Sequence, residues 1–394
     1  MSMLKKFLFI FGLLIVLVSC SIKYTNVDPY KMLSGVFFID SLTTEQLKSK
    51  DTVKILIVPG HDDEYWGTQY KGVKEAELNL ELAKYLTLYL RQEKDFQVFL
   101  IRDEEGYDAG YLDYLDDHEE EIFEFQERHK EIMRSLSEVG LVDAHVNYLL
   151  GSKALSDIAN RLYGINKWSN DAGIDIVIHI HFNDYRGRKS WSVGKYSGLT
   201  VYVPDKQYSN SKVSRSVAES ISASLGKFFS YSDLPMEKSE DGIKESQDFI
   251  APGAFNTLDA AGMLIEYGYV YEPQFTNSNT REAVLKKMAV QTYLGVLDFF
   301  DKEPKREIVS LSHGWENDLK KGLNNNRDVI ALQFLLASKG FYPPTGLSLN
   351  QCPTSGSFGN CTLSAVKSFQ KNYDIVPASG FVGPLTRSKL NDFK

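Results

Sequence analysis

The sequence contains few cysteines, no excess of basic charge and no apolar run of membrane-spanning length. Its 394 residues include only three cysteines, too few for a disulfide scaffold. The 44 lysines and arginines are outnumbered by 52 aspartates and glutamates, so the net charge is −8. A general nucleic-acid binder needs a basic face, and this charge balance argues against nucleic acid as a partner.

The chain does have enough apolar surface to build a large core. Hydrophobic residues make up 43% and aromatic residues 12%, with 22 tyrosines and 23 phenylalanines. A length of 394 residues suits two domains better than one, since a domain typically holds about 100–200 residues. We therefore expect a folded, multidomain protein rather than a disordered or fibrous chain.

The first 20 residues have the features of an export signal. Lys5 and Lys6 are followed by an apolar run over residues 7–18. That run is too short to cross a bilayer core of ~30 Å as a helix, but it suits the core of a signal peptide. Residues 17–20, Leu-Val-Ser-Cys, resemble the lipobox of bacterial lipoproteins. The resemblance implies that Cys20 is diacylated and anchors the mature chain to a membrane.

This interpretation places the protein in the cell envelope, exported and membrane-anchored, in the periplasm or at the cell surface. A short uncleaved anchor, or a cysteine at position 20 by chance, is the alternative. If Cys20 carries lipid, Cys352 and Cys361 remain. An even pair in an exported protein is most simply a disulfide, worth roughly 2–3 kcal/mol on the chain-entropy estimate. Two free buried thiols are the alternative.

Short apolar runs alternate with segments of helical spacing through most of the chain. The spacing predicts strands over residues 53–58, 97–101, 174–180, 199–203 and 263–265, and helices over 75–93, 156–170 and 211–229. Strands that alternate with helices indicate a mainly parallel, open α/β sheet with helices on both faces.

Composition also divides the chain into segments. We expect a signal peptide over 1–20, a tether over 21–50, the main α/β domain over 51–302, a polar linker over 303–322 and a small α-helical domain over 323–394. Residues 103–155 of the main domain are interpreted as an acidic helical insertion, because 103–137 hold thirteen acidic and three basic residues. A solvated helical face is the simple interpretation of this insertion, and a lid over the site is the alternative.

Two histidines and two glutamates fall at the ends of predicted strands or at a helix start. His61 follows the first strand, Glu75 begins the first helix, and His181 and Glu266 end later strands. Ligands of open α/β sheets bind beyond the carboxyl ends of the strands, so these side chains should converge. Two imidazoles and a carboxylate suit a three-ligand zinc site, with a second carboxylate as general base. His61, Glu75 and His181 can therefore bind zinc, and Glu266 can serve as the base.

The motifs around these residues resemble those of the zinc-dependent N-acetylmuramoyl-L-alanine amidases of the bacterial cell wall. In chain order, over about residues 52–300, they are Ile57-Val-Pro-Gly-His61, Glu75-Ala-Glu-Leu-Asn-Leu80, Leu100-Ile-Arg102, Arg161 with Asn166, His179-Ile-His-Phe-Asn183 and Leu264-Ile-Glu-Tyr-Gly-Tyr269. The resemblance implies hydrolysis of the amide that joins N-acetylmuramic acid to L-alanine. It assigns the same zinc ligands and the same catalytic glutamate.

Some positions depart from the family pattern. Asp62 and Asp63 stand where the family usually has two glycines, and Tyr65 replaces a common aspartate. We expect a polar loop there, although either aspartate is also a candidate acceptor for a ligand histidine. His179 replaces a serine, and we interpret it as a packed or supporting residue, with a ligand role as the alternative. Glu77 is the less favoured alternative to Glu75 as ligand.

Residues 323–394 resemble the helical peptidoglycan-binding domain that is often fused to wall hydrolases. The signals are Leu332-Gln333, Phe369-Gln370 and a Gly-x-Val-Gly-x-x-Thr pattern over residues 380–386. The resemblance implies peptidoglycan as partner and a domain that raises the local substrate concentration. It does not identify an activator protein.

Two other functions stay open at this point. One is a non-catalytic peptidoglycan-binding lipoprotein on a degenerate amidase scaffold, suggested by the substitutions beside His61. The other is a zinc peptidase that cuts within the stem peptide.

Overall fold

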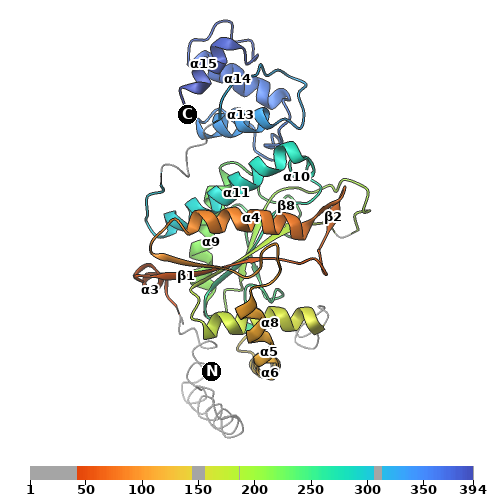
Figure 1. Ribbon diagram of the computed structural model, residues 1–394, viewed down its shortest axis with the longest axis vertical. Coiled ribbons are helices and arrows are strands. Elements are labelled where there is room, and N and C mark those ends of the chain that lie inside the picture. Colours follow the sequence, from red (N-terminus) through yellow and green to blue (C-terminus); the bar gives the residue numbers. More distant parts are fainter. Residues whose placement is uncertain (1–41, 144–155, 186, 306–312, 394) are drawn as a thin grey trace.

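The computed structural model describes residues 42–143, 156–185, 187–305 and 313–393 (Figure 1). Cys20, most of the expected tether and residues 144–155 of the expected insertion lie outside these ranges. None of the helices within the described ranges combines the length and the apolar character that a membrane crossing demands.

The core of the main domain is a six-stranded sheet in the order β4-β1-β5-β8-β6-β7. The strands are β1 (Val53–Pro59), β4 (Phe96–Leu100), β5 (Ile176–Asn183), β6 (Thr200–Pro204), β7 (Ile243–Ser246) and β8 (Ala261–Tyr269). All neighbours run parallel except β6 and β8, which pair antiparallel. The predicted mainly parallel α/β sheet is therefore confirmed.

Helices cover both faces of this sheet (Figure 1). One face is covered by α4 (Glu75–Leu90), α9 (Ser211–Gly226) and α11 (Ser278–Phe299). The other face is covered by α8 (Ser156–Asp171), against which α5 (Ala109–Asp117) and α6 (Glu119–Glu138) pack. Where it is described, the acidic insertion therefore contains two helices, and both pack on α8.

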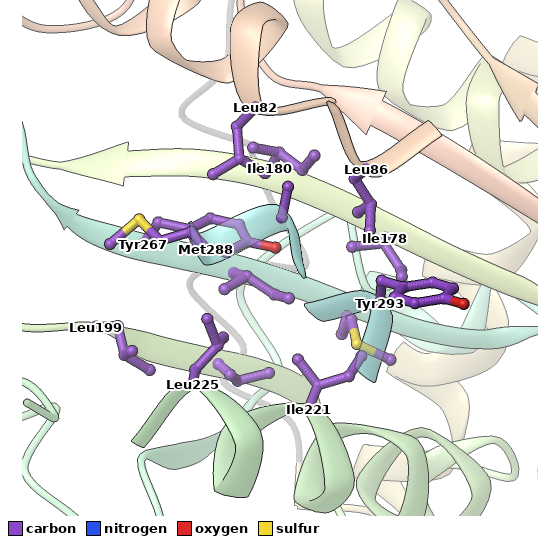
Figure 2. Close-up of a cluster of buried hydrophobic side chains, with 14 of the residues drawn as sticks. Leu82, Leu86, Ile178, Ile180, Leu199, Ile221, Leu225, Tyr267, Met288 and Tyr293 are labelled. Carbon is purple, nitrogen blue, oxygen red and sulfur yellow. The ribbon is translucent and has the colours of Figure 1, made fainter. Parts of the chain in front are cut away.

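Strand β5 shows how the alternation of side chains separates the two faces. Ile178 and Ile180 are fully buried against Leu82 and Leu86 of α4 in the cluster drawn in Figure 2. The residues between and after them, His179 and His181, point to the opposite face and line a cleft there. The strand therefore contributes to the core with one face and to the candidate site with the other.

Three further short elements, which the sequence analysis did not predict, complete the main domain. They are α3 (Thr44–Lys48), α10 (Pro273–Thr276) and a 3₁₀ turn, η1 (Ala254–Asn256). A two-stranded hairpin of β2 (Gln69–Tyr70) and β3 (Val73–Lys74) lies between β1 and α4. The strand β7 was missed as well, because so few residues give no readable alternation.

The C-terminal domain is built from α13 (Arg327–Ser338), α14 (Asn360–Asn372) and α15 (Pro384–Asn391) around a separate apolar core. Trp315 and Leu319 belong to this core, and Leu319 exchanges two backbone hydrogen bonds with Val382. The expected linker over 303–322 is thus too long, and the domain begins before residue 323. The polar composition of that segment concealed its two apolar anchors.

Two glutamines explain the sequence signals of this domain. Gln333 donates to the Ser357 carbonyl at 3.1 Å and accepts the Gly356 N–H at 3.0 Å. Gln370 makes the same pair of bonds to Phe381 and Gly380, at 2.8 and 2.7 Å. Each buried amide therefore fixes the loop that precedes the next helix.

The C-terminal domain packs directly on the main domain. Ile330 and Phe334 of α13 join the core cluster of the main domain. The Thr354 hydroxyl donates to the Phe228 carbonyl at 2.9 Å, from the loop between α13 and α14. A disulfide joins Cys352 and Cys361 at this loop, with the Cα atoms 5.8 Å apart.

Candidate active site

Three of the predicted site residues converge at the carboxyl ends of the central strands. His61 Nε2 lies 3.3 Å from Glu75 Oε1, and His181 Nδ1 lies 3.0 Å from the same oxygen. One donor atom from each of the three lies within 4.8 Å of the others. Glu77 is exposed instead, with its carboxylate at the Lys74 N–H, so Glu75 is the residue that faces the histidines.

The glycines on either side of His61 make room for this cluster. A Cβ at Gly60 would lie 2.1 Å from His181 Cε1, and a Cβ at Gly67 would lie 2.3 Å from Glu75 Oε2. Gly67 also has a φ of +72°, a backbone conformation that glycine adopts without strain. Any side chain at these two positions would displace a residue of the cluster.

Two buried side chains hold the end of β1 in place. Arg102, from the end of β4, donates to the carbonyls of Pro59, Gly60 and Ala76 at 3.1–3.2 Å. Asn79 of α4 donates to the Gly60 carbonyl at 2.7 Å. These bonds tie the strand, the helix and the residue before His61 together, so the position of the imidazole is set by the scaffold.

Two backbone donors also bind the Glu75 carboxylate. The N–H of Thr68 donates to Oε2 at 3.0 Å, and the N–H of Phe182 approaches Oε1 at 3.3 Å. Burial raises the pKa of Glu75, but the hydrogen bonds and charges of His181 and His61 outweigh this and lower it well below its usual range. The carboxylate is therefore charged at neutral pH and available to a cation.

The two histidines differ in environment. Burial lowers the pKa of His61, yet the hydrogen bond and charge of Glu75 prevail, and the pKa is raised overall. For His181, burial dominates over Glu75 and the pKa is lowered. His61 keeps 33% of its side chain exposed, against 17% for His181. The open side of the cluster is therefore the side of His61.

Glu266 lies beside His181, because the two are register partners on β8 and β5. Its Oε2 is buried and has no hydrogen-bond partner among the described residues. Burial raises the pKa of Glu266 well above the usual carboxyl range, and the negative charges of Glu75 and Glu237 raise it further. A buried, unpaired carboxyl at a cleft is a strong candidate for proton transfer.

Glu237 supports this corner of the site, and nothing in the sequence indicated it. It is 5% exposed and accepts hydrogen bonds from Asn183, the Tyr202 hydroxyl, Ser232 and the Tyr269 hydroxyl, at 2.6–3.0 Å. These four bonds hold the carboxylate in one position. Its negative charge is one of the causes of the raised pKa of Glu266.

His179 is a neutral, packed residue on the floor of the cleft. It is 1% exposed, and burial lowers its pKa to about 3. Its Nε2 has no hydrogen-bond partner among the described residues. It does not belong to the three-residue cluster, so it is not among the candidate ligands.

The cleft has a volume of about 400 Å³ and is bounded on one side by α8. Arg161 of α8 pairs with Asp62 at 2.8 Å, and the Tyr107 hydroxyl donates to the same carboxylate at 3.1 Å. Asp62 therefore ties the His61 loop to α8, and its other oxygen accepts the N–H of Tyr65. Within the described ranges no residue of α5 or α6 lines the cleft, although Tyr107, which precedes them, does.

The donor set suits zinc. Two imidazoles and one carboxylate within a few ångströms are the ligand set of a catalytic zinc site, which leaves a position for other molecules. A side chain at Gly60 or Gly67 would clash with the three residues of the cluster. Glu266 lines the same cleft. These observations fit a dication at His61, Glu75 and His181.

Comparison with known families agrees with the geometry. Residues 55–298 match the N-acetylmuramoyl-L-alanine amidase family, which is more than half of the chain. The chain belongs to this family. Its reaction is the hydrolysis of the amide between N-acetylmuramic acid and L-alanine, which confirms the function that the motifs predict.

Residues 325–390 of the amidase match a putative peptidoglycan-binding domain, so peptidoglycan is both the substrate and the polymer for the second domain. Since peptidoglycan lies outside the cytoplasmic membrane, the amidase acts there. No curated protein matches the sequence.

Several solved structures are similar to the amidase. An N-acetylmuramoyl-L-alanine amidase from Clostridium difficile 630 is 18% identical, with a TM-score of 0.39, over 64% of this chain and 99% of that one. An amidase from Mycobacterium smegmatis is 12% identical, with a TM-score of 0.41, over 64% and 99%. The catalytic domain of CwlV from Bacillus (Paenibacillus) polymyxa is 14% identical, with a TM-score of 0.38, over 64% and 100%.

Proposed function

We propose that the amidase is zinc-dependent, with His61, Glu75 and His181 as the metal ligands and Glu266 as the catalytic base. The observation that carries this proposal is the convergence of the three donor atoms within 4.8 Å, beside a buried carboxyl. Zinc bound there supplies Lewis-acid chemistry to an amide carbonyl and to the attacking water.

The other steps belong to residues of the chain. Glu266 accepts a proton from the water that attacks the lactyl carbonyl of N-acetylmuramic acid. It then delivers this proton to the nitrogen of L-alanine as the C–N bond breaks, so the first products are a lactyl carboxylic acid and an amine. The acid proton then passes to the amine, which leaves a carboxylate and an ammonium group. Burial and the neighbouring negative charges raise the pKa of Glu266, which makes its carboxylate a stronger base than an exposed one.

The scaffold contributes positioning. Arg102 and Asn79 fix the backbone before His61, and the N–H groups of Thr68 and Phe182 orient Glu75. A precise ligand geometry matters because small misplacements at a reacting centre cost large factors in rate. The arrangement is therefore pre-organised by the fold.

We also propose that the mature enzyme is a lipoprotein anchored through Cys20, whose lipobox motif is the support for this. Two acyl chains would hold it stably on a membrane. The domain division proposed is a signal peptide, a tether, the amidase domain with its acidic helical insertion, and a peptidoglycan-binding domain beginning before residue 323. Within the last domain, the Cys352–Cys361 disulfide suits an oxidising compartment.

The test is a digest of purified sacculi by the full-length protein in three forms: zinc-loaded, stripped with a chelator, and restored with zinc. Mass analysis should show an intact lactyl group and a new L-alanine amine with the first and third forms only. Full activity after verified zinc removal would refute zinc dependence. Cuts inside the stem peptide would favour the peptidase alternative, and wall binding without products would favour the non-catalytic one.

A further inference from the structure

Residues 187–192, which follow β5, lie beside the β2–β3 hairpin (Figure 1). Arg188 anchors this loop through a bidentate pair with Asp184, at 2.6 and 2.7 Å. The same guanidinium donates to the carbonyls of Lys189, Ser190 and Ser192 at 3.0–3.1 Å, and to the carbonyl of Gln69 in β2 at 3.0 Å. With 3% of its side chain exposed, Arg188 is an internal strut of this loop.

The loop that Arg188 holds in place carries the exposed Trp191. Trp191 is 77% exposed, the most exposed tryptophan among the described residues. It borders a hollow of about 340 Å³ whose opposite wall is the hairpin, including Tyr70 and Lys71. Trp66, at the base of the hairpin, is also 40% exposed. Large aromatic side chains held out on a fixed loop are typical of a binding surface, since exposing them to water is unfavourable.

Lysines accompany these rings. Lys74 lies 5.0 Å from the Trp66 ring, Lys71 lies 5.4 Å from the Tyr70 ring, and Lys189 lies 5.9 Å from the Trp191 ring. We call Trp66, Lys71, Lys74, Lys189 and Trp191 the hairpin patch; the Tyr70 ring beneath them is buried. The patch is basic on a chain whose net charge is −8, so its charge is local and opposite to that of the whole protein.

The hairpin patch is connected to the catalytic cleft. Thr68 directly precedes β2 and lines the cleft, and its hydroxyl donates to Asp184 at 2.5 Å. Asp184 lines the cleft as well and holds Arg188. The backbone N–H of Thr68 binds Glu75, so the patch and the proposed metal ligands share one rigid segment. A polymer whose scissile amide lies in the cleft would therefore extend onto the patch.

We propose that the hairpin patch is an extended subsite for the glycan strand of peptidoglycan. This rests on the proposed function, because the cleft must hold the scissile amide for the strand to reach the patch. Indole rings offer broad flat surfaces to the apolar faces of amino-sugar rings, and the lysines suit the carboxylates of neighbouring stem peptides. The patch then selects polymeric substrate over free muramoyl peptides.

A membrane surface is the competing occupant, because exposed tryptophan and lysine also favour lipid interfaces. The continuity of the patch with the cleft through Thr68 and Asp184 favours substrate instead. Binding to vesicles is accordingly one arm of the test.

The experiment compares the full-length wild type with Trp191→Ala and with the double variant Trp66→Ala/Trp191→Ala. Phe123→Ala is the matched control, since Phe123 is a 61% exposed aromatic residue on α6, away from the cleft. Each protein is assayed on solubilised long glycan strands that carry stem peptides, and on a single N-acetylmuramoyl peptide without neighbouring sugars. Binding of peptide-free glycan strands and of anionic phosphatidylglycerol vesicles is measured in parallel.

For Trp191→Ala we expect kcat/KM on long strands to fall at least fivefold, mainly through KM, with a larger loss in the double variant. Activity on the single muramoyl peptide should stay within twofold, and Phe123→Ala should match the wild type on both. Binding of peptide-free strands should weaken in parallel. A wild type that binds strands through the patch but hydrolyses neither substrate would refute the catalytic proposal and not the subsite.

Three results would overturn the subsite. The first is an equal loss on both substrates, which indicates a structural effect on the cleft. The second is no loss on long strands in the double variant. The third is a loss of vesicle binding alone, which would assign the patch to the membrane.

Discussion

The two faces of the central sheet use the same strands for different purposes. On the face toward α4, Ile178 and Ile180 are fully buried among leucines (Figure 2). On the opposite face, His179, His181 and the neighbouring Glu266 line a cleft. His179 and Glu266 each have a buried polar atom without a hydrogen-bond partner in the described part of the chain. Unpaired buried polar groups are destabilising. The face with the cleft therefore lowers the stability of the fold, whereas the face toward α4 raises it. The site is therefore built by a one-residue alternation on a strand whose other side is core.

The largest effect on activity is expected from a change at His181 that leaves Ile180 as it is. His181→Ala should remove the bound zinc and lower kcat/KM at least about 10³-fold, because a two-ligand site holds the metal poorly. Zinc content by mass spectrometry and hydrolysis of sacculi measure the two effects. Retention of one zinc per chain in this variant would contradict the ligand assignment.

A change at Glu266 should affect proton transfer without affecting metal binding. Glu266→Gln should keep zinc at one per chain but reduce kcat by about 10²–10⁴-fold, the usual contribution of a general base. The parallel measurement of zinc and of turnover decides the outcome. Near-normal turnover with intact zinc would show that another group accepts the proton.

On the packed face the effect should be on stability alone. Ile180→Ala should lower the free energy of unfolding by about 2–5 kcal/mol, because it leaves a cavity against α4. Urea denaturation measures this loss. The folded variant should still bind one zinc, and loss of zinc at low urea would mean that the two faces are not independent.

Lys287 of α11 is a buried lysine on the face of the sheet toward α4, whereas Glu266 is a carboxyl on the face with the cleft. The Lys287 ammonium lies 3.6 Å from the Phe228 ring and 5.7 Å from the Phe334 ring, and burial lowers its pKa to about 7. In the unfolded chain the pKa of this lysine is about 10.4. At pH 7 and below, the protonated ammonium therefore opposes folding to the full extent. Above pH ~10.4 the group is neutral in both states, so this cost is absent. Lys287→Met should thus raise the free energy of unfolding by about 3–5 kcal/mol at pH 7.

This stabilisation should shrink as the pH rises toward 10. Urea midpoints of the wild type and Lys287→Met at pH 7 and pH 9.5 test the sign, since the other titrating groups are common to both proteins. A constant difference across this range would show that Lys287 is not neutralised by burial.

The smallest expected effect concerns Glu237. Its negative charge raises the pKa of Glu266, so Glu237→Gln should lower that pKa and move the acid limb of the pH–rate profile to lower pH. A shift of about one pH unit is expected from the loss of one nearby charge. An unchanged acid limb, with zinc retained, would show that Glu237 only supports the fold.

Much of this arrangement could be predicted from the sequence because its signals are local. Short apolar runs gave the strands that carry His181 and Glu266, and the helix start gave Glu75. The strands nevertheless run further than expected, to Asn183 and Tyr269, so both residues lie inside them rather than at their ends.

Other features depend on contacts that are distant in the sequence. Helix α11 was not predicted, because it is buried on most sides between α4, α9 and the C-terminal domain and so has no one-sided period. Glu237 gave no signal, since its role comes from donors on other elements. The bond between Arg161 and Asp62 spans 99 residues, so the loop after His61 could be read only as polar.

The zinc ligands can be located by anomalous X-ray diffraction at the zinc absorption edge, from crystals of the full-length protein grown with zinc. We expect one strong peak bonded to His61, Glu75 and His181 at about 2.0–2.2 Å, with Glu266 beside it and outside the ligand set. A protein free of zinc at this cluster, or a peak held by other residues, would contradict this ligand assignment.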